Sequence, residues 1–236
     1  MEEKISPLEI IEYEKEVALY LMNNSNNQET NEFSNISFEL KSAVDFIEAR
    51  AIFYSNIITN ILLTLQEEHI SYFADLDQRL KKRERIIEKI YQKMNVDQKS
   101  MIDAINCIGD SLRYTIVIDD KIYIEKVEEY LSKIEDFGYN VFKFKNAWGN
   151  EYYQGINVIF EDSEGFKFEI QFHTPNGFAI KEGKLRNVYN IIRNPQSPSD
   201  LVKKCNLIRK YYQGQVRVPF NALEYKYEGK KRSDGK

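Results

Sequence analysis

Histidine and cysteine are scarce in this chain of 236 residues, and their scarcity excludes two classes of site. His69 and His173 are the only histidines, which is too few for a histidine-rich metal centre. Cys107 and Cys205 form no metal or redox motif, and we expect them to be reduced thiols of a protein that acts in the cytoplasm. Chemistry must therefore come from carboxylates, amides, hydroxyls and basic side chains.

Long apolar runs and a strong positive charge are also missing. The most apolar window, residues 51–65, is interrupted by serine, threonine and asparagine, and it is too short to span a membrane. We expect no signal peptide, because the first residues are acidic and no apolar core follows them, which leaves export by another route open. The net charge of -4 does not indicate a nucleic-acid binder for the chain as a whole.

The patterns that are present predict an α+β fold. Apolar residues recur at helical spacing in several long segments, and shorter β-favouring segments lie between them. The expected helices cover residues 6–22, 38–66, 70–94, 121–136, 178–192 and 199–212, and the expected strands cover residues 114–119, 139–145, 153–160 and 166–174. We expect a mixed sheet of four or five strands with helices packed on it and an N-terminal helical region.

The chain divides into that N-terminal helical region, residues 1–69, and a larger part, residues 70–236, which carries the motifs. Residues 23–37 are rich in Asn, Ser, Gln and Thr and predict a mobile connection, and the basic tail from Tyr225 to Lys236 is expected to fray. Two roles stay open for residues 1–69. They either regulate the protein or dock a partner, or they complete the core.

The strand expected over residues 166–174 has a polar face that could serve as a site. Side chains alternate between the two faces of a strand, so its apolar residues share one face. The other face carries Lys167, Glu169, Gln171 and His173. A carboxylate, an amide and an imidazole in a row suit a catalytic or binding site, although an ordinary solvated sheet face shows the same alternation.

Two groups of basic residues each have a functional and an ordinary interpretation. Five basic residues lie within residues 79–85, and they form either a cationic ledge for a polyphosphate or a solvated helix face. Lys143 and Lys145, expected on the same strand face as Val141, belong either to a site or to an edge strand that lysines keep from aggregating.

Tyr153 is a candidate for stacking on a nucleobase. It is expected to share a strand face with Gly155 and Asn157, and the glycine would leave the tyrosine ring open to a flat partner. A packed or surface tyrosine is the commoner case in a chain with 16 tyrosines.

Five segments, taken in order, resemble the RelA/SpoT-type nucleotide pyrophosphokinases, the synthetase domains that make alarmones. The family's patterns are R-x-K followed by I-x-E-K, D-x-x-G-x-R, R-x-K-D, G-Y-[RQ]-S-[LI]-H and V-E-I-Q-I-R-T. The matching segments are Arg79–Lys81 with Ile86–Ile90, Asp110 with Arg113–Val117, Lys143–Asn146, Tyr153–Asn157 and Phe168–Thr174. The resemblance covers roughly residues 70–193, and the first 70 residues match nothing in it.

The resemblance implies an enzyme that moves the β,γ-pyrophosphate of ATP to a ribose 3′-hydroxyl and releases AMP. It implies Mg²⁺, with Asp110 as a metal ligand and Glu169 as a second ligand or as the general base. On the donor side it implies that Arg79 stacks on the adenine, while the ATP phosphates are bound by Lys81, Arg113, Lys143 and Lys145. On the acceptor side it implies that Tyr153 stacks on the base, with Asn157, Gln171 and His173 nearby.

Departures from the family pattern lie mostly in the acceptor half. Asn146 replaces an acid, Asn157 replaces a histidine and His173 replaces an arginine, so GDP or GTP, ADP or ATP, and the 3′ end of tRNA all stay open as acceptors. The glycine turn after Asp110 is missing, which leaves Asp119 as a less favoured metal ligand.

A short chain with a variant acceptor site looks like a toxin branch of the family, with an antitoxin or immunity protein as a partner. Two histidines cannot supply the family's hydrolase domain, so synthesis without hydrolysis is expected. The basic residues Lys203, Lys204, Arg209 and Lys210 would contact RNA if tRNA were the acceptor, and otherwise form a solvated helix face. A catalytically silent nucleotide- or partner-binding domain is the remaining alternative.

Overall fold

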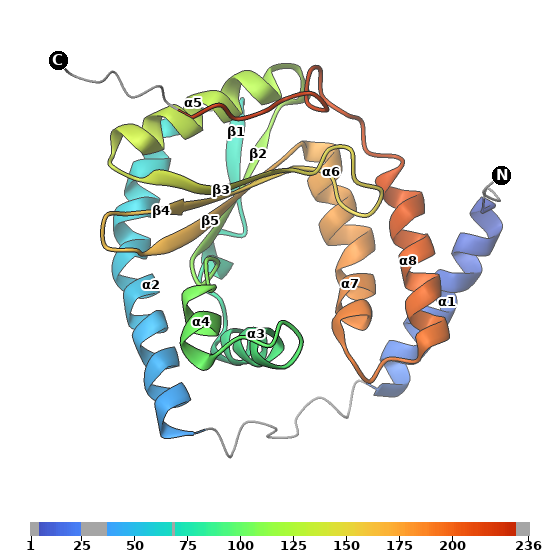
Figure 1. Cartoon of the computed structure of the whole chain (residues 1–236). Helices are drawn as coiled ribbons and strands as arrows, with labels where there is room; N and C mark the ends of the chain where they lie inside the picture. The colour runs from blue at the N-terminus through green and yellow to red at the C-terminus, as the bar shows by residue number, and fades with distance from the viewer. Residues whose placement is uncertain (1–4, 25–36, 68, 230–236) are drawn as a thin grey trace.

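A five-stranded mixed sheet organises the chain, and helices pack around it (Figure 1). The computed structural model describes residues 5–24, 37–67 and 69–229. The helices are α1 (Pro7–Asn24), α2 (Phe38–Leu65), α3 (Arg83–Asn95), α4 (Met101–Asn106), α5 (Tyr123–Asp136), α6 (Pro175–Ile180), α7 (Arg186–Arg193) and α8 (Ser199–Gln213). The strands are β1 (Ser71–Ala74), β2 (Arg113–Ile118), β3 (Asn140–Asn146), β4 (Ile156–Glu161) and β5 (Lys167–His173). The expected α+β architecture is confirmed.

The strand order is β1-β2-β5-β4-β3, which places β5 in the centre of the sheet and β3 at an edge. β2 runs parallel to β5, and the other three neighbouring pairs are antiparallel. The β4–β5 hairpin closes at Gly165, where φ is 76° and the carboxylate of Asp162 accepts backbone N–H groups from Glu164 and Phe166. The expected turn over residues 162–165 is therefore present.

One face of the sheet is apolar and is buried under α2 and α5. Residues such as Ile116, Val158 and Phe172 are fully buried there, as alternation along each strand requires. α2 contributes Ile58 and α5 contributes Tyr130 to the same cluster. Because one face is filled in this way, the polar residues of the same strands must lie on the opposite face.

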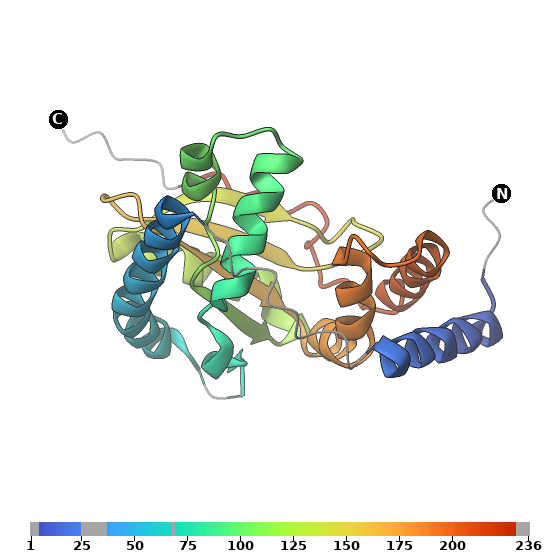
Figure 2. The same ribbon diagram turned by 90° about the horizontal axis from the view of Figure 1, so that it is seen from below.

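A second apolar cluster holds the helical layer formed by α1, α7 and α8, which stands away from the sheet (Figures 1 and 2). Ile10 and Val17 of α1 are buried in this cluster against residues of α7 and α8. Both helices of the N-terminal region are therefore packed against elements that follow residue 69. The division of the chain at residue 69 stays a prediction.

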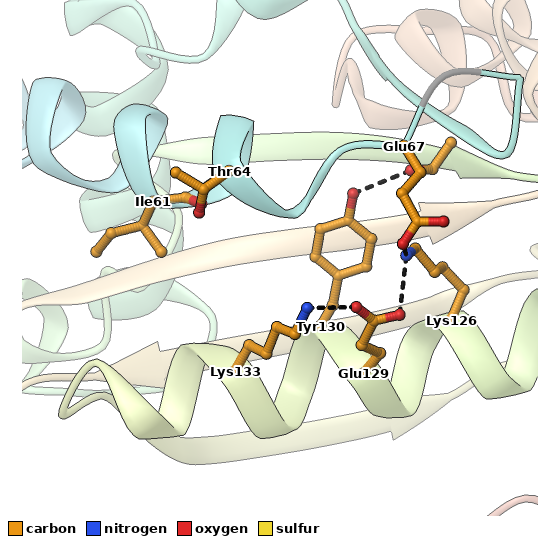
Figure 3. A network of polar contacts seen from close by, with 8 residues as sticks. Ile61, Thr64, Glu67, Lys126, Glu129, Tyr130 and Lys133 are labelled. Atoms are coloured by element: carbon orange, nitrogen blue, oxygen red, sulfur yellow. Dashed lines mark hydrogen bonds and ion pairs between the residues drawn. The ribbon is translucent and has the colours of Figure 1, made fainter.

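A buried lysine ties the connection between α2 and β1 to α5 (Figure 3). Lys126 is 4% exposed, and its ammonium group donates to Glu67 and to Glu129, which also accepts from Lys133. An ammonium group buried without carboxylates would be costly, so this network compensates the charge. Among the described residues, none of the helices is both long enough and apolar enough to cross a membrane.

The helix expected over residues 70–94 is wrong in its first half. Residues 71–74 form β1, which pairs with β2, and α3 begins only at Arg83. His69 and Asp75 have positive φ values of 66° and 51°, so the backbone turns at both ends of the strand. The apolar residues of this segment fit a strand as well as a helix, and pairing with β2, which lies far along the chain, decides between them.

Three smaller expectations are also corrected. A bulge between Val141 and Lys143 shifts the register of β3, so Val141 faces the core while Lys143 lies on the other face. β4 begins at Ile156, which leaves Tyr153 in the loop before it. Tyr225 and Tyr227 pack against Phe144 and are not frayed, while residues 25–36 and 230–236 lie outside the described residues.

Candidate active site

The polar face of the sheet brings together most of the residues singled out from the sequence. In one row across the strands, Arg113 of β2 lies beside Glu169 of β5. In the next row, Gln171 of β5 lies between Thr115 of β2 and Asn157 of β4. These rows form because each strand alternates with a period of two and the apolar partners are buried on the other face.

Asp110 lies just before β2 and is held by two lysines. Its Oδ2 accepts from Lys81 Nζ, and its Oδ1 accepts from Lys89 Nζ at 2.7 Å. Burial raises the pKa of Asp110, but the two ammonium groups outweigh that effect and lower the pKa to about 2. Asp110 is therefore a charged carboxylate at every pH at which the protein would work.

Glu169 is the second carboxylate of this face, and neutral groups hold it. Its Oε1 accepts from Asn157 Nδ2 at 3.4 Å, and its Oε2 accepts from Gln171 Nε2 at 3.2 Å. Burial raises the pKa of Glu169, and the negative charge of Asp110 raises it further, while Arg113, Lys89 and Lys81 act in the opposite direction. Glu169 can therefore take up a proton more readily than an ordinary glutamate.

Tyr153 and His173 lie next to Asn157. The Tyr153 hydroxyl is 2.6 Å from Asn157 Oδ1 and 3.1 Å from His173 Nε2, and the two rings meet edge to face. Burial raises the pKa of Tyr153 and holds the pKa of His173 well below its usual range. Both side chains are therefore uncharged at neutral pH.

Sequence reasoning missed Lys181 and gave no role to Lys89. Lys181 begins a π-helical segment, Lys181–Leu185, and its Nζ lies 3.2 Å from Gln171 Oε1. Burial lowers the pKa of Lys181, with Glu182 acting against this effect. A glycine inside the helical pattern, Gly183, was the available signal for an irregular helix here. π-Helical turns are rare overall, but those that occur are often at functional sites.

Arg79, Lys143 and Lys145 do not hydrogen-bond to the two carboxylates, and their expected roles in ATP binding stay predictions. Arg79 donates to the Leu76 carbonyl oxygen and lies near the hydroxyl of Tyr114, a residue of the apolar face. Lys143 and Lys145 are exposed on the edge strand β3 and lie on the polar face of the sheet, Lys143 in the row of Glu169 and Lys145 in the row of Gln171, with β4 between them and β5. With strands about 4.8 Å apart, these lysines start roughly 10 Å from the β5 backbone.

The expected alternative ligand Asp119 lies at the wrong end of β2. It follows the last residue of the strand and caps a short 3₁₀ helix by accepting from the Lys121 N–H. Glu169 pairs with Arg113, the first residue of β2, and so lies at the Asp110 end. At about 3.3 Å per residue, Asp119 is roughly 20 Å from that end, which excludes it as a partner of Glu169.

Some basic residues of the cluster 79–85 contact the site, and others pair with the helix α2. Lys81 reaches Asp110, whereas Arg83 pairs with Asp45 and Glu48 of α2. Of the two interpretations left open for this group, Lys81 fits the cationic site, whereas Arg83 is held in ion pairs with α2.

On α8, acidic residues likewise compensate part of the basic group. Lys204 pairs with Glu16 and Asp200, and Lys210 pairs with Glu151. These pairs reduce the positive charge that α8 presents to a polyanion.

Two carboxylates on one face suit a Mg²⁺ ion, which takes hard oxygen ligands and usually only one or two carboxylates from the protein. The described residues contain no group of three or more His, Cys, Asp or Glu side chains that could hold a metal. The negative charge of Asp110 raises the pKa of Glu169, and a divalent ion between the two carboxylates would remove that repulsion. Each carboxylate keeps free lone pairs beside its present donors, so the pair fits Mg²⁺.

No family model matches the chain, and no curated protein matches it. Solved structures with a similar fold include the Type VI effector Tas1 in complex with its immunity protein, at 17% identity and a TM-score of 0.45, covering 74% of this chain and 98% of that chain. Small alarmone synthetase 2 from Bacillus subtilis matches at 14% identity with a TM-score of 0.47, covering 75% and 95% of the two chains. A GTP pyrophosphokinase family protein from Streptococcus pneumoniae matches at 14% identity with a TM-score of 0.44, covering 76% and 90%. At these identities and scores, function has to be argued from the residues of the site.

Proposed function

We propose that this protein is an ATP-dependent nucleotide 3′-pyrophosphokinase. It would transfer the β,γ-pyrophosphate of ATP to the ribose 3′-hydroxyl of a purine nucleotide, release AMP and act as a toxin or effector. The observation that carries the proposal is the pairing of Asp110 and Glu169 on one polar face with Lys81, Lys89 and Arg113 around them. The motif resemblance supplies the reaction, and this geometry supplies groups that suit it.

The proposed step forms one bond and breaks one. The acceptor 3′-oxygen attacks the β-phosphorus of ATP, the bond from that phosphorus to the oxygen bridging the α-phosphorus breaks, and AMP leaves with the bridging oxygen. Glu169 takes the proton of the 3′-hydroxyl, a role that its raised pKa suits. Lys81, Lys89 and Arg113 bind and orient the phosphate oxygens. Asp110 would hold Mg²⁺, with Glu169 as a second ligand or as the base alone, and the ion neutralises charge on those oxygens when bound.

A purine nucleotide is the preferred acceptor in this proposal, either GDP or GTP, or ADP or ATP. The tRNA 3′ end is less favoured because Lys204 and Lys210 of α8 are already paired with acids. A silent binding domain is less favoured because a binder needs no carboxylate with a raised pKa beside a carboxylate fixed in its charged form.

A label-transfer assay tests the proposal. Purified protein, Mg²⁺ and γ-labelled ATP are incubated separately with ADP, ATP, GDP, GTP and deacylated tRNA, and AMP release is measured in parallel. The proposal expects label on the 3′ position of a nucleotide, with one AMP formed per transfer and no transfer by Glu169→Gln. Label on tRNA alone would move the function to tRNA modification. Binding of ATP without transfer to any acceptor would support the silent domain.

A further inference from the structure

Both carboxylate oxygens of Glu169 are held by side-chain amides. Asn157 Nδ2 donates to Oε1, and Gln171 Nε2 donates to Oε2, at 3.4 and 3.2 Å. A carboxylate can only accept hydrogen bonds, so each amide must turn its NH₂ group toward Glu169. An amide that flipped by 180° would present its oxygen instead and repel the carboxylate. The orientation of the two amides therefore decides whether Glu169 is held in place.

Each amide oxygen faces a second side chain that sets this orientation. Lys181 Nζ lies 3.2 Å from Gln171 Oε1, and an ammonium group can only donate, so it accepts no NH₂ group on that side. The Tyr153 hydroxyl lies 2.6 Å from Asn157 Oδ1, a distance typical of an O–H group that donates to oxygen. Donors thus point toward Glu169 along two short chains, one starting at Lys181 and one passing through Tyr153.

The second chain begins one residue further back, at His173. Because the Tyr153 proton is used on Asn157, the tyrosine oxygen can only accept from His173 Nε2, which lies 3.1 Å away. His173 is 1% exposed, and its Nδ1 meets no partner at full hydrogen-bond geometry among the described residues, although the nearby Gln154 backbone raises the pKa of the ring against the effect of burial. Nδ1 lies close to Gly155, where an added Cβ would stand 3.0 Å from it. The chain through Tyr153 uses the neutral tautomer of His173 with the proton on Nε2, and the competing tautomer would carry its proton on the other ring nitrogen, toward the Gln154 backbone.

We infer that Tyr153 and Lys181 are positioning residues, which act through Asn157 and Gln171 to fix the orientation of the Glu169 carboxylate. Tyr153 does this through its hydroxyl group, whereas the motif resemblance implies a ring that stacks on the acceptor base. His173 fills the space beside Gly155 that was expected to leave the tyrosine ring open. The inference rests on the proposed function only in taking Glu169 as the carboxylate that reacts.

Kinetics of paired variants separate positioning from stacking. Tyr153→Phe keeps the ring and removes the hydroxyl, so a positioning role lowers kcat about tenfold and leaves the acceptor KM within about twofold, as loss of an outer hydrogen-bond partner does. Lys181→Met has the same expected pattern, and Lys181→Arg restores most of kcat. Lys184→Met is the matched control, because Lys184 lies on the same π-helical segment, is exposed and contacts Glu14. A wild-type kcat in Tyr153→Phe, with a raised acceptor KM in Tyr153→Leu, overturns the inference.

Nuclear magnetic resonance of the free protein gives a readout that needs no activity. The ¹⁵N shifts of the His173 ring report its tautomer, and His69→Asn removes the signals of the other histidine. The inference expects the Nε2–H tautomer and a shift of the Nε2 signal in Tyr153→Phe. It also expects the Gln171 side-chain amide signals to move in Lys181→Met and to stay unchanged in Lys184→Met. The positioning role is refuted by a proton on Nδ1, or by Gln171 amide signals that do not change in Lys181→Met, even if the protein transfers no pyrophosphate. If the expected signals are seen but no pyrophosphate is transferred to any acceptor, only the proposed function is refuted.

Discussion

The two carboxylates of the polar face are held in opposite ways. Two ammonium groups surround Asp110 and lower its pKa to about 2, whereas two neutral amides hold Glu169, whose pKa is raised by burial and by the charge of Asp110. Charged partners keep a group in one protonation state, and neutral partners hold a group in position while leaving it able to exchange a proton. A site that must both bind phosphates and move a proton needs one carboxylate of each kind.

The largest expected effect comes from removing the carboxylate that can exchange a proton. Glu169→Gln keeps the shape of the side chain but cannot take the 3′-hydroxyl proton, so the transfer rate should fall by about 10³-fold. Initial rates of AMP release measure the loss. Glu161→Gln is the control, because Glu161 lies on the neighbouring strand β4 and pairs with Lys167. Equal rates in Glu169→Gln and wild type would remove Glu169 from the chemistry.

The next effect concerns the carboxylate that stays charged. Asp110→Asn leaves Lys81 and Lys89 facing each other without a negative charge, and we expect the free energy of unfolding at pH 7 to fall by about 2 kcal/mol. The folded-state pKa of Asp110 lies below its unfolded value, so its stabilisation is present above about pH 4. The stabilisation is lost as the pH falls toward 2.

Urea unfolding of wild type and Asp110→Asn at pH 7, 4.5 and 3 checks this prediction. The difference in the free energy of unfolding between the two proteins should become smaller as the pH falls. Asp77→Asn, at an exposed position in the 3₁₀ helix before α3, should change little at any pH. A gap that is the same at pH 7 and pH 3 would mean that the charge of Asp110 contributes no stability.

Local patterns in the sequence were enough to place one part of the site. Glu169, Gln171 and His173 share a face of β5 because strand alternation depends only on neighbouring residues and on which face is apolar. Helical periodicity in the same way predicted α2, which runs from Phe38 to Leu65 against an expected 38–66. Elements whose identity is decided by their own residues could thus be predicted from sequence.

Contacts between distant segments could not be predicted in the same way. Lys181 meets Gln171 only because α6 turns the chain back over the end of β5, and although Gly183 marks an irregular helix, it does not show which residue of β5 Lys181 contacts. Arg79 was expected on a helix beside the phosphates, but its carbonyl oxygen accepts from the Arg113 N–H at the start of β2, and its side chain lies near Tyr114. The bulge in β3 that separates Val141 from Lys143 likewise depends on the partner strand β4.

An effect of similar size is expected at Gly155, beside the neutral half of the site, where the backbone is most tightly packed. Gly155 has φ of +148°, and a Cβ there would stand 2.8 Å from the Phe172 carbonyl oxygen. Gly155→Ala should therefore lower the free energy of unfolding by about 1–3 kcal/mol, through backbone strain and the clash. Gly183→Ala is the control, since nothing lies within 4 Å of its added Cβ, and it should be neutral or slightly stabilising. Thermal unfolding of both variants measures the difference, and equal melting temperatures would contradict the crowding at Gly155.

The smallest expected effect is that of Glu169→Gln on stability. It tests the contrast between the two carboxylates most directly, because Glu169→Gln should stabilise the fold at pH 7 whereas Asp110→Asn should destabilise it. The folded-state pKa of Glu169 lies above its unfolded value, so the folded state is most stable relative to the unfolded chain below the unfolded pKa. That advantage is lost as the pH rises through the folded pKa, because folding then buries a charge that the nearby cations compensate only in part. Glu169→Gln removes this charge, so the variant should be more stable than wild type at pH 7, and its gain should shrink toward pH 4. Urea unfolding at the two pH values measures both gains. A variant less stable than wild type at pH 7 would show that the Asn157 and Gln171 hydrogen bonds outweigh the cost of burying the charge. In that case, the charged form of both carboxylates would stabilise the fold, and the contrast between them would fail.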